Sequence, residues 1–87
     1  MVVVFYRDRA GYASWCDEHP SGFVLNVGHK GSPARLHRAE CGTVSPHSPR
    51  NGDPTLRMKV CAVSRQVLER WAHDRKEAVT LCANCDV

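Results

Sequence analysis

Residues 82–85 read Cys82-Ala83-Asn84-Cys85, and the predicted fold depends on this C-x-x-C pair. A tight turn between two cysteines at this spacing brings both sulfurs within about 2.3 Å of one zinc ion. The same spacing occurs in redox pairs, but thioredoxin-like sites place it between a strand and a helix of a βαβ unit. No helix is predicted to follow Cys85, so the pair indicates half of a metal site.

The other half of the site must come from upstream, where residues 37–41 form an H-x3-C pair, His37-Arg38-Ala39-Glu40-Cys41. We predict a strand that ends at His37 and a loop that contains Cys41, so that the imidazole and the thiolate can reach the same point. Three cysteines and one histidine form a closed ligand set that is typical of structural zinc. The predicted ligands of one zinc ion are His37, Cys41, Cys82 and Cys85.

Two further cysteines complete the five in the chain. Cys61 is the alternative fourth ligand and would give an all-cysteine site in place of His37. However, it lies inside an alternating strand and has no second ligand close by in sequence, and a buried free cysteine is common and usually inert. Cys16 lies beside two acidic residues that disfavour its thiolate, and with His19 it would form only half of a second site.

The length of 87 residues indicates one domain with a modest core, 1–87, in which a bound metal supplies much of the folding free energy. The longest apolar run, residues 1–6, is far shorter than the roughly 20 residues that span a bilayer. It also lacks the basic start of a signal peptide. We therefore expect a cytoplasmic protein, whose cysteines bind metal rather than form disulfides. The metal core is expected at about 22–86.

The remaining pattern predicts an α+β fold: a small antiparallel sheet, one main helix and a C-terminal zinc knuckle. Ser64 is a good N-cap, and the apolar stripe after it predicts the helix over about 64–75. Residues 43–55 are rich in Pro and Ser, so they are expected to form a loop that is mobile unless a partner orders it. Strands are expected from their apolar and alternating residues over 2–6, 12–16, 23–27, 34–37 and 56–61.

Four segments along the chain form a pattern that is known from one family. They are Phe-Val-Leu-Asn (23–26), Leu-His-Arg-Ala-Glu-Cys (36–41), Val-Cys-Ala-Val-Ser (60–64) before a helix, and Cys-Ala-Asn-Cys (82–85). This pattern resembles the Ada-type metal-binding domain, the zinc module at the N-terminus of the Ada DNA-repair protein. It is also similar to small actinobacterial and phage proteins of unassigned function. The resemblance implies a zinc ion held by His37, Cys41, Cys82 and Cys85.

One position departs from the Ada pattern. In Ada the first ligand is a cysteine that accepts a methyl group from a DNA phosphotriester, whereas this chain has His37 there. A zinc-bound neutral imidazole is a poor methyl acceptor compared with a thiolate. The sequence also contains no G-x-S-x-G motif, no P-loop and no suggestive pair of carboxylates. We therefore expect a binding module without methyl transfer or other enzymatic activity.

The net charge of +3 is concentrated in the middle of the chain. Residues 30–76 carry ten basic and four acidic side chains, a balance of +6, whereas the segments on either side are acidic. A basic surface favours binding of DNA or another nucleic acid, because its cations neutralise phosphates. Tyr12 and Trp15 are expected to stack on bases if they are exposed. The candidate basic contacts are Arg35, Arg38, Arg50, Arg57, Lys59 and Arg65.

The alternative function is a protein-interaction module, for example a phage or mobile-element protein that binds and modulates a host protein. Its contacts would be the loop at 43–55 and the acidic turn at 17–19. Neither function involves a membrane. The sequence leaves both open, and we take nucleic-acid binding as the prediction.

Overall fold

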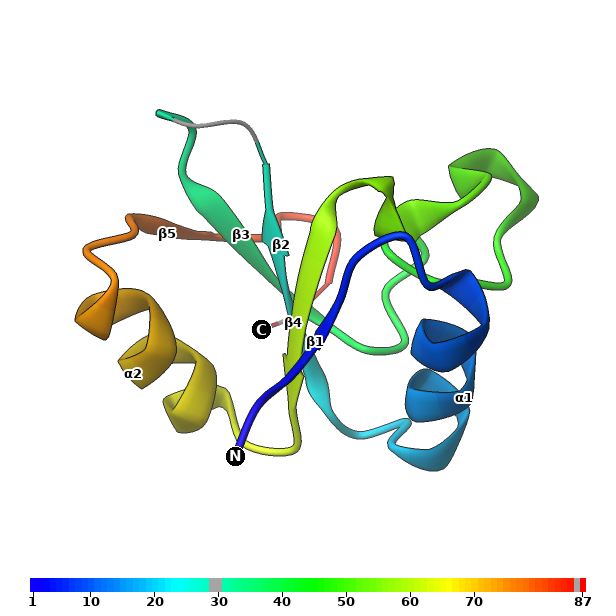
Figure 1. The fold of residues 1–87 in the computed structure, drawn as a ribbon, viewed down its shortest axis with the longest axis horizontal. Coiled ribbons are helices and arrows are strands. Elements are labelled where there is room, and N and C mark those ends of the chain that lie inside the picture. The colour runs from blue at the N-terminus through cyan, green and yellow to red at the C-terminus, as the bar shows by residue number, and fades with distance from the viewer. Residues whose placement is uncertain (29–30, 86) are drawn as a thin grey trace.

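The alternating stretches of the sequence pair into one mixed five-stranded sheet that has a helix on each face (Figure 1). This is a computed structural model that describes residues 1–28, 31–85 and 87. No helix among these residues has the length and apolar character needed to cross a membrane. The predicted α+β class is confirmed. In sheet order the strands are β1 (Val3–Phe5), β4 (Met58–Ala62), β2 (Phe23–Val27), β3 (Ala34–Arg38) and β5 (Val79–Leu81).

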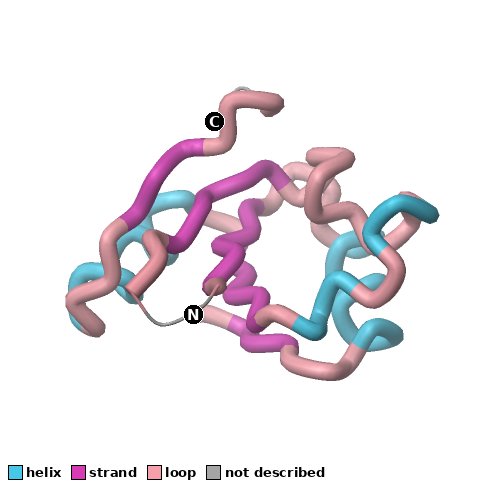
Figure 2. The backbone as a smooth tube through the Cα atoms, turned by 90° about the horizontal axis from the view of Figure 1, so that it is seen from above, coloured by secondary structure: helices cyan, strands magenta, loops and turns pink. Residues whose placement is uncertain are grey.

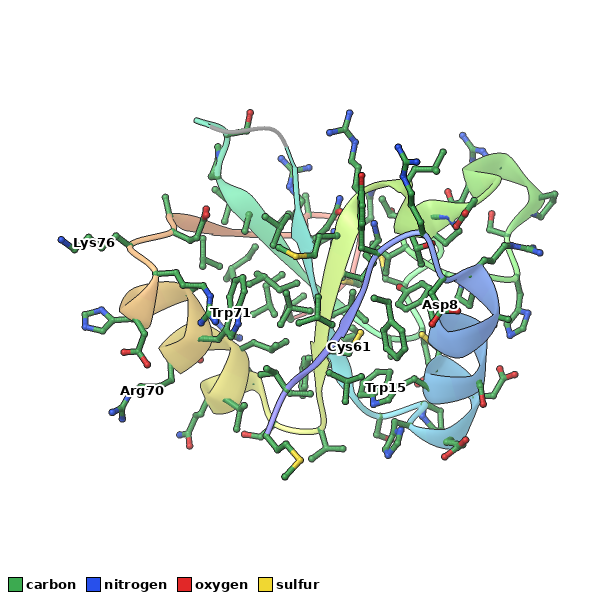
Figure 3. All side chains as sticks on the ribbon, in the orientation of Figure 1. Asp8, Trp15, Cys61, Arg70, Trp71 and Lys76 are labelled. Atoms are coloured by element: carbon green, nitrogen blue, oxygen red, sulfur yellow. The ribbon has the colours of Figure 1, made fainter. Side chains whose placement is uncertain are left out.

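One face of the sheet, called here the α2 face, packs against helix α2 (Arg65–Asp74). Leu25 of β2 pairs directly with Leu36 of β3 and Val60 of β4, so these three side chains share this face. Leu68 and Trp71 of the helix cover them. Figure 3 shows Trp71 turned from α2 toward the sheet. The predicted helix and the predicted alternation of β2 and β4 are therefore confirmed.

The opposite face, the α1 face, packs against a helix where a strand was predicted over 12–16. That prediction is wrong, because Asp8 caps helix α1 (Arg9–Glu18) and its Oδ1 accepts a hydrogen bond from the Gly11 N–H at 2.9 Å. Residues spaced three and four apart then form the buried side of the helix. They are Tyr12, Trp15 and Cys16.

The connection between β3 and β4 is held by hydrogen bonds, whereas a mobile loop was expected over 43–55. It contains two short 3₁₀ helices, Pro49–Asn51 and Pro54–Leu56. The buried Tyr12 hydroxyl donates to the Val44 carbonyl at 2.7 Å, and Asn51 Nδ2 donates to the Ser45 carbonyl at 2.9 Å. Bonds from the core and from within the connection thus order this segment without a partner.

Replacement of Tyr12 by Phe tests the first of these bonds. The ring stays in the core, but the buried Val44 carbonyl loses its donor, so the free energy of unfolding should fall by about 1–2 kcal/mol. Chemical denaturation in zinc-containing buffer measures the change. Tyr6→Phe removes an exposed hydroxyl and serves as the control, with an expected change below about 0.5 kcal/mol. Equal stability of Tyr12→Phe and the wild type would contradict the role given to this bond.

The fifth strand changes the expected antiparallel sheet into a mixed one. β5 lies parallel to β3, with Leu36 opposite Leu81, and the two strands run side by side in Figure 2. Parallel strands end at the same edge of a sheet. The residues that follow β3 and those that follow β5 therefore meet, although they are far apart in the sequence.

Candidate metal centre

The shared end of β3 and β5 brings four metal-ligating side chains together. One comes from β3 itself, one from the turn after it, and two from the segment after β5. The backbone N–H of Cys82 donates to the Leu36 carbonyl at 3.0 Å, which continues the pairing of the strands into the C-x-x-C segment. The four residues that could hold a metal ion are His37, Cys41, Cys82 and Cys85.

The spacing of these side chains fits a shared ion. Their ligand atoms all lie within 4.8 Å of one another, and the sulfurs of Cys41 and Cys82 are 3.9 Å apart. Tetrahedral coordination with metal–sulfur bonds of about 2.3 Å places two sulfurs about 3.8 Å apart, whereas a disulfide needs about 2.05 Å. The cysteines are free thiols. The cluster therefore has metal-site geometry and not that of an oxidised pair.

His37 is buried in this cluster, and a bound metal would explain why its ring nitrogens have no hydrogen-bond partner in the described part of the chain. Its side chain is only 1% exposed, and among the described residues neither Nδ1 nor Nε2 has a hydrogen-bond partner. A buried polar atom without a partner costs about 1–3 kcal/mol. Burial, followed by the charges of Arg35 and Lys59, lowers the pKa of His37 to about 4. The imidazole is therefore neutral near pH 7, which is the form that binds metal.

Backbone N–H groups point at the sulfurs. Arg38 N donates to Cys85 Sγ at 3.4 Å, and Asn84 N donates to Cys82 Sγ at 3.3 Å. Burial alone raises the pKa of Cys82, but hydrogen bonds, including those from the N–H groups of Asn84 and Cys85, reverse this and lower it. Such bonds stabilise thiolates around an ion, where three thiolates and a divalent cation carry a net charge of −1.

Cys61, the alternative ligand, lies outside the cluster. It occupies the same cross-strand row as His37, but β2 runs between them and Val24 is paired with both. Its side chain is buried in the α1-face core with Cys16 and Tyr12. Burial raises the pKa of the Cys61 thiol well above its usual range, which opposes the thiolate that a metal needs.

The proposed basic contacts do not form one surface, and Lys59 is buried. Its side chain is 3% exposed, and its ammonium donates to Asn26 Oδ1 at 2.9 Å and to the Pro54 and Arg57 carbonyls. Burial lowers the pKa of Lys59 to about 8. The prediction that Lys59 contacts a ligand on an exposed sheet face is therefore wrong, because its ammonium is buried and binds carbonyls of the loop between β3 and β4.

The arginine candidates divide between the two sides of the sheet. Arg35 is exposed on the α1 face, in the cross-strand row of Lys59. Arg50 and Arg57 line a common depression of about 380 Å³. Arg65 begins α2, on the opposite side, and its Nε lies 3.4 Å from Glu69 Oε1. The Arg38 guanidinium lies 6.0 Å from the centre of the Phe23 ring.

The aromatic candidates for base stacking are both buried. Tyr12 and Trp15 fill the α1-face core, and Figure 3 shows Trp15 turned from α1 toward the sheet. Tyr6, which is not among the predicted stacking residues, is 56% exposed. It directly follows β1, and its position at the end of an apolar run, before three charged residues, is the sequence signal for an exposed ring.

Comparison of the chain with known proteins finds no matching family model, no similar curated protein and no similar solved structure. The resemblance to the Ada-type domain therefore stays a prediction.

Proposed function

We propose that this protein is a structural-zinc module that binds nucleic acid through exposed arginines. The zinc ion would be held by His37, Cys41, Cys82 and Cys85. The observation that carries this proposal is the buried His37 ring, which has no hydrogen-bond partner among the described residues and has a ring nitrogen within 4.8 Å of three cysteine sulfurs. A metal supplies the missing partner.

The ligand types favour zinc among biological metals. Thiolate and imidazole together are the usual donors for zinc, whereas calcium and magnesium prefer oxygen. Four protein ligands fill a tetrahedral site, so no coordination position is left for a substrate. A structural ion of this kind supports a binding module rather than an enzyme, and the neutral imidazole at the first ligand position supports the absence of methyl transfer.

Nucleic-acid binding is supported by the charge around the centre. Cys41 and Arg50 line the same depression, of about 690 Å³, and Arg57 lines the adjoining one. Arg35 is exposed on the same face of the sheet. Arginine at such positions binds phosphate through its planar guanidinium and releases counterions.

Binding of DNA at rising salt concentration tests this function. With three phosphates neutralised, the logarithm of the association constant should fall against log salt with a slope of about −2 to −3. Each of Arg35→Gln, Arg50→Gln and Arg57→Gln should reduce the slope by nearly one. Arg70→Gln is the matched control, because Arg70 points outward from α2 beside Asp74 (Figure 3).

Absence of binding to single- and double-stranded DNA and RNA at low salt would remove this function. The protein-interaction module would then be the remaining hypothesis, and it predicts one stoichiometric protein partner in a pulldown.

A further inference from the structure

Three surface depressions adjoin one another between the metal centre and the end of β1. The first, about 690 Å³, is lined by Cys41 and Asn84 at the metal centre. It shares Arg50 and Asn51 with the second, of about 380 Å³. The second shares Leu56 and Arg57 with the third, of about 590 Å³, which Tyr6 lines. We call these three depressions the track.

The walls of the track are held in place by the loop between β3 and β4. Asn51 Nδ2 donates to the carbonyls of Gly42 at 3.0 Å and Ser45 at 2.9 Å, which fixes the side of the first depression. Arg7 N donates to the Thr55 carbonyl at 2.7 Å, so the loop is joined to the segment that follows Tyr6. The track is therefore a preformed surface, and binding there costs little ordering of the chain.

A positively charged arginine lies at each place where two depressions of the track meet. Arg50 and Arg57 are exposed, and the buried ammonium of Lys59 lies under the middle depression. Asp53 is an acidic residue on the track, but its Oδ1 accepts hydrogen bonds from the N–H of Thr55 at 2.9 Å and from its hydroxyl at 2.6 Å. Three cations and one carboxylate leave the track with a net positive charge, which suits a chain of phosphates that passes from one depression to the next.

The far end of the track is apolar and aromatic. Tyr6 is 56% exposed and Leu56 is 62% exposed, and both line the third depression. The Arg7 guanidinium lies 5.4 Å from the centre of the Tyr6 ring. A positive groove that ends on an exposed ring is the combination that binds single strands, because unpaired bases can stack on the ring. A duplex keeps its bases stacked inside and offers this surface only phosphates.

We propose that the track binds a single-stranded nucleic acid, with phosphates on Arg50 and Arg57 and one base stacked on Tyr6. This inference rests on the proposed function and adds to it the form of the nucleic acid and the path that it takes over the surface.

Fluorescence anisotropy with a 5′-labelled strand of twelve thymidines and a labelled twelve-base-pair duplex tests the inference, with zinc-loaded protein at constant salt. We expect the single strand to bind at least about 10-fold more tightly than the duplex. Tyr6→Leu, which removes the ring but keeps an apolar side chain, should weaken single-strand binding about 5- to 100-fold. Tyr6→Phe keeps the ring and should stay within about twofold of the wild type.

The outcomes separate the two levels of the proposal. Equal affinity for both probes, or no effect of Tyr6→Leu, would overturn the single-strand inference and leave nucleic-acid binding intact. If Arg35→Gln weakened binding while Arg50→Gln and Arg57→Gln did not, the path along the track would be wrong. Absence of binding to either probe at low salt would remove the proposed function as well. Retained zinc content and circular dichroism confirm that each variant is folded.

Discussion

Removal of zinc is expected to unfold the protein. In the proposed site the metal would join Cys41 to Cys82, residues 41 positions apart, and without it the His37 ring nitrogens are buried with no partner among the described residues. Structural zinc contributes about 10–16 kcal/mol in zinc-finger peptides, which is as large as the whole stability of a typical domain, about 5–15 kcal/mol. Circular dichroism and thermal melting with excess chelator measure the loss.

Two controls make this experiment decisive. Chelator that is already saturated with zinc should leave the melting temperature unchanged, and addition of zinc to the unfolded protein should restore the spectrum. A metal-free chain that keeps its circular dichroism and its melting temperature would show that the two hydrophobic cores hold the fold without the ion. The scaffold role of the metal would then be wrong.

Substitution of a single ligand is expected to have the second largest effect. Cys82→Ser should lower zinc affinity by at least about 100-fold, because a neutral hydroxyl replaces a buried thiolate whose pKa is already lowered by N–H donors. Zinc per chain, measured by atomic emission after dialysis against a competing chelator, should fall from one toward zero. His37→Ala should behave in the same way.

Cys61→Ala is the matched control for these ligand variants. It removes a buried sulfur from the same core and should lower the free energy of unfolding by about 1–2 kcal/mol, while one zinc per chain is retained. Loss of zinc from Cys61→Ala, together with retention of zinc by His37→Ala, would instead establish the all-cysteine site.

Local periodicity was sufficient for much of the fold. β2 and β4 alternate between a face covered by α2 and a face covered by α1, so their pattern predicts the strands and the side chains that share each face. The stripe after Ser64 predicts α2 for the same reason. The strand predicted over 12–16 is wrong: Asp8 and the spacing of Tyr12, Trp15 and Cys16 signal a capped amphipathic helix, but aromatic residues also favour strands.

Non-local pairing was beyond prediction from the sequence. β5 has three residues, Val79–Leu81, and its parallel partner β3 lies more than 40 positions earlier, so no local pattern reveals it. The ligand spacings nevertheless identified the four residues that the pair brings together. The spacing within each half of the site, the H-x3-C pair and the C-x-x-C pair, could be recognised in the sequence. The strand pairing that joins the two halves could not.

The sequence shows which side chains are charged or aromatic but does not show which of them face solvent. Lys59 is basic, yet its ammonium is buried and donates to the carbonyls of Pro54 and Arg57 in the loop between β3 and β4. Tyr12 is aromatic, yet its hydroxyl is directed at Val44 inside the core. Among the described Phe, Tyr and Trp residues, Tyr6 is the one whose ring is exposed. The position of each side chain relative to the sheet therefore decides its role.

X-ray absorption spectroscopy of the zinc-loaded protein at the zinc edge tests the central claim most directly, because it reports the ligand atoms of the ion. The account predicts three sulfurs at about 2.3 Å and one nitrogen at about 2.0–2.1 Å. A shell of four sulfurs, or one that contains oxygen in place of sulfur, would contradict the ligand set of His37, Cys41, Cys82 and Cys85.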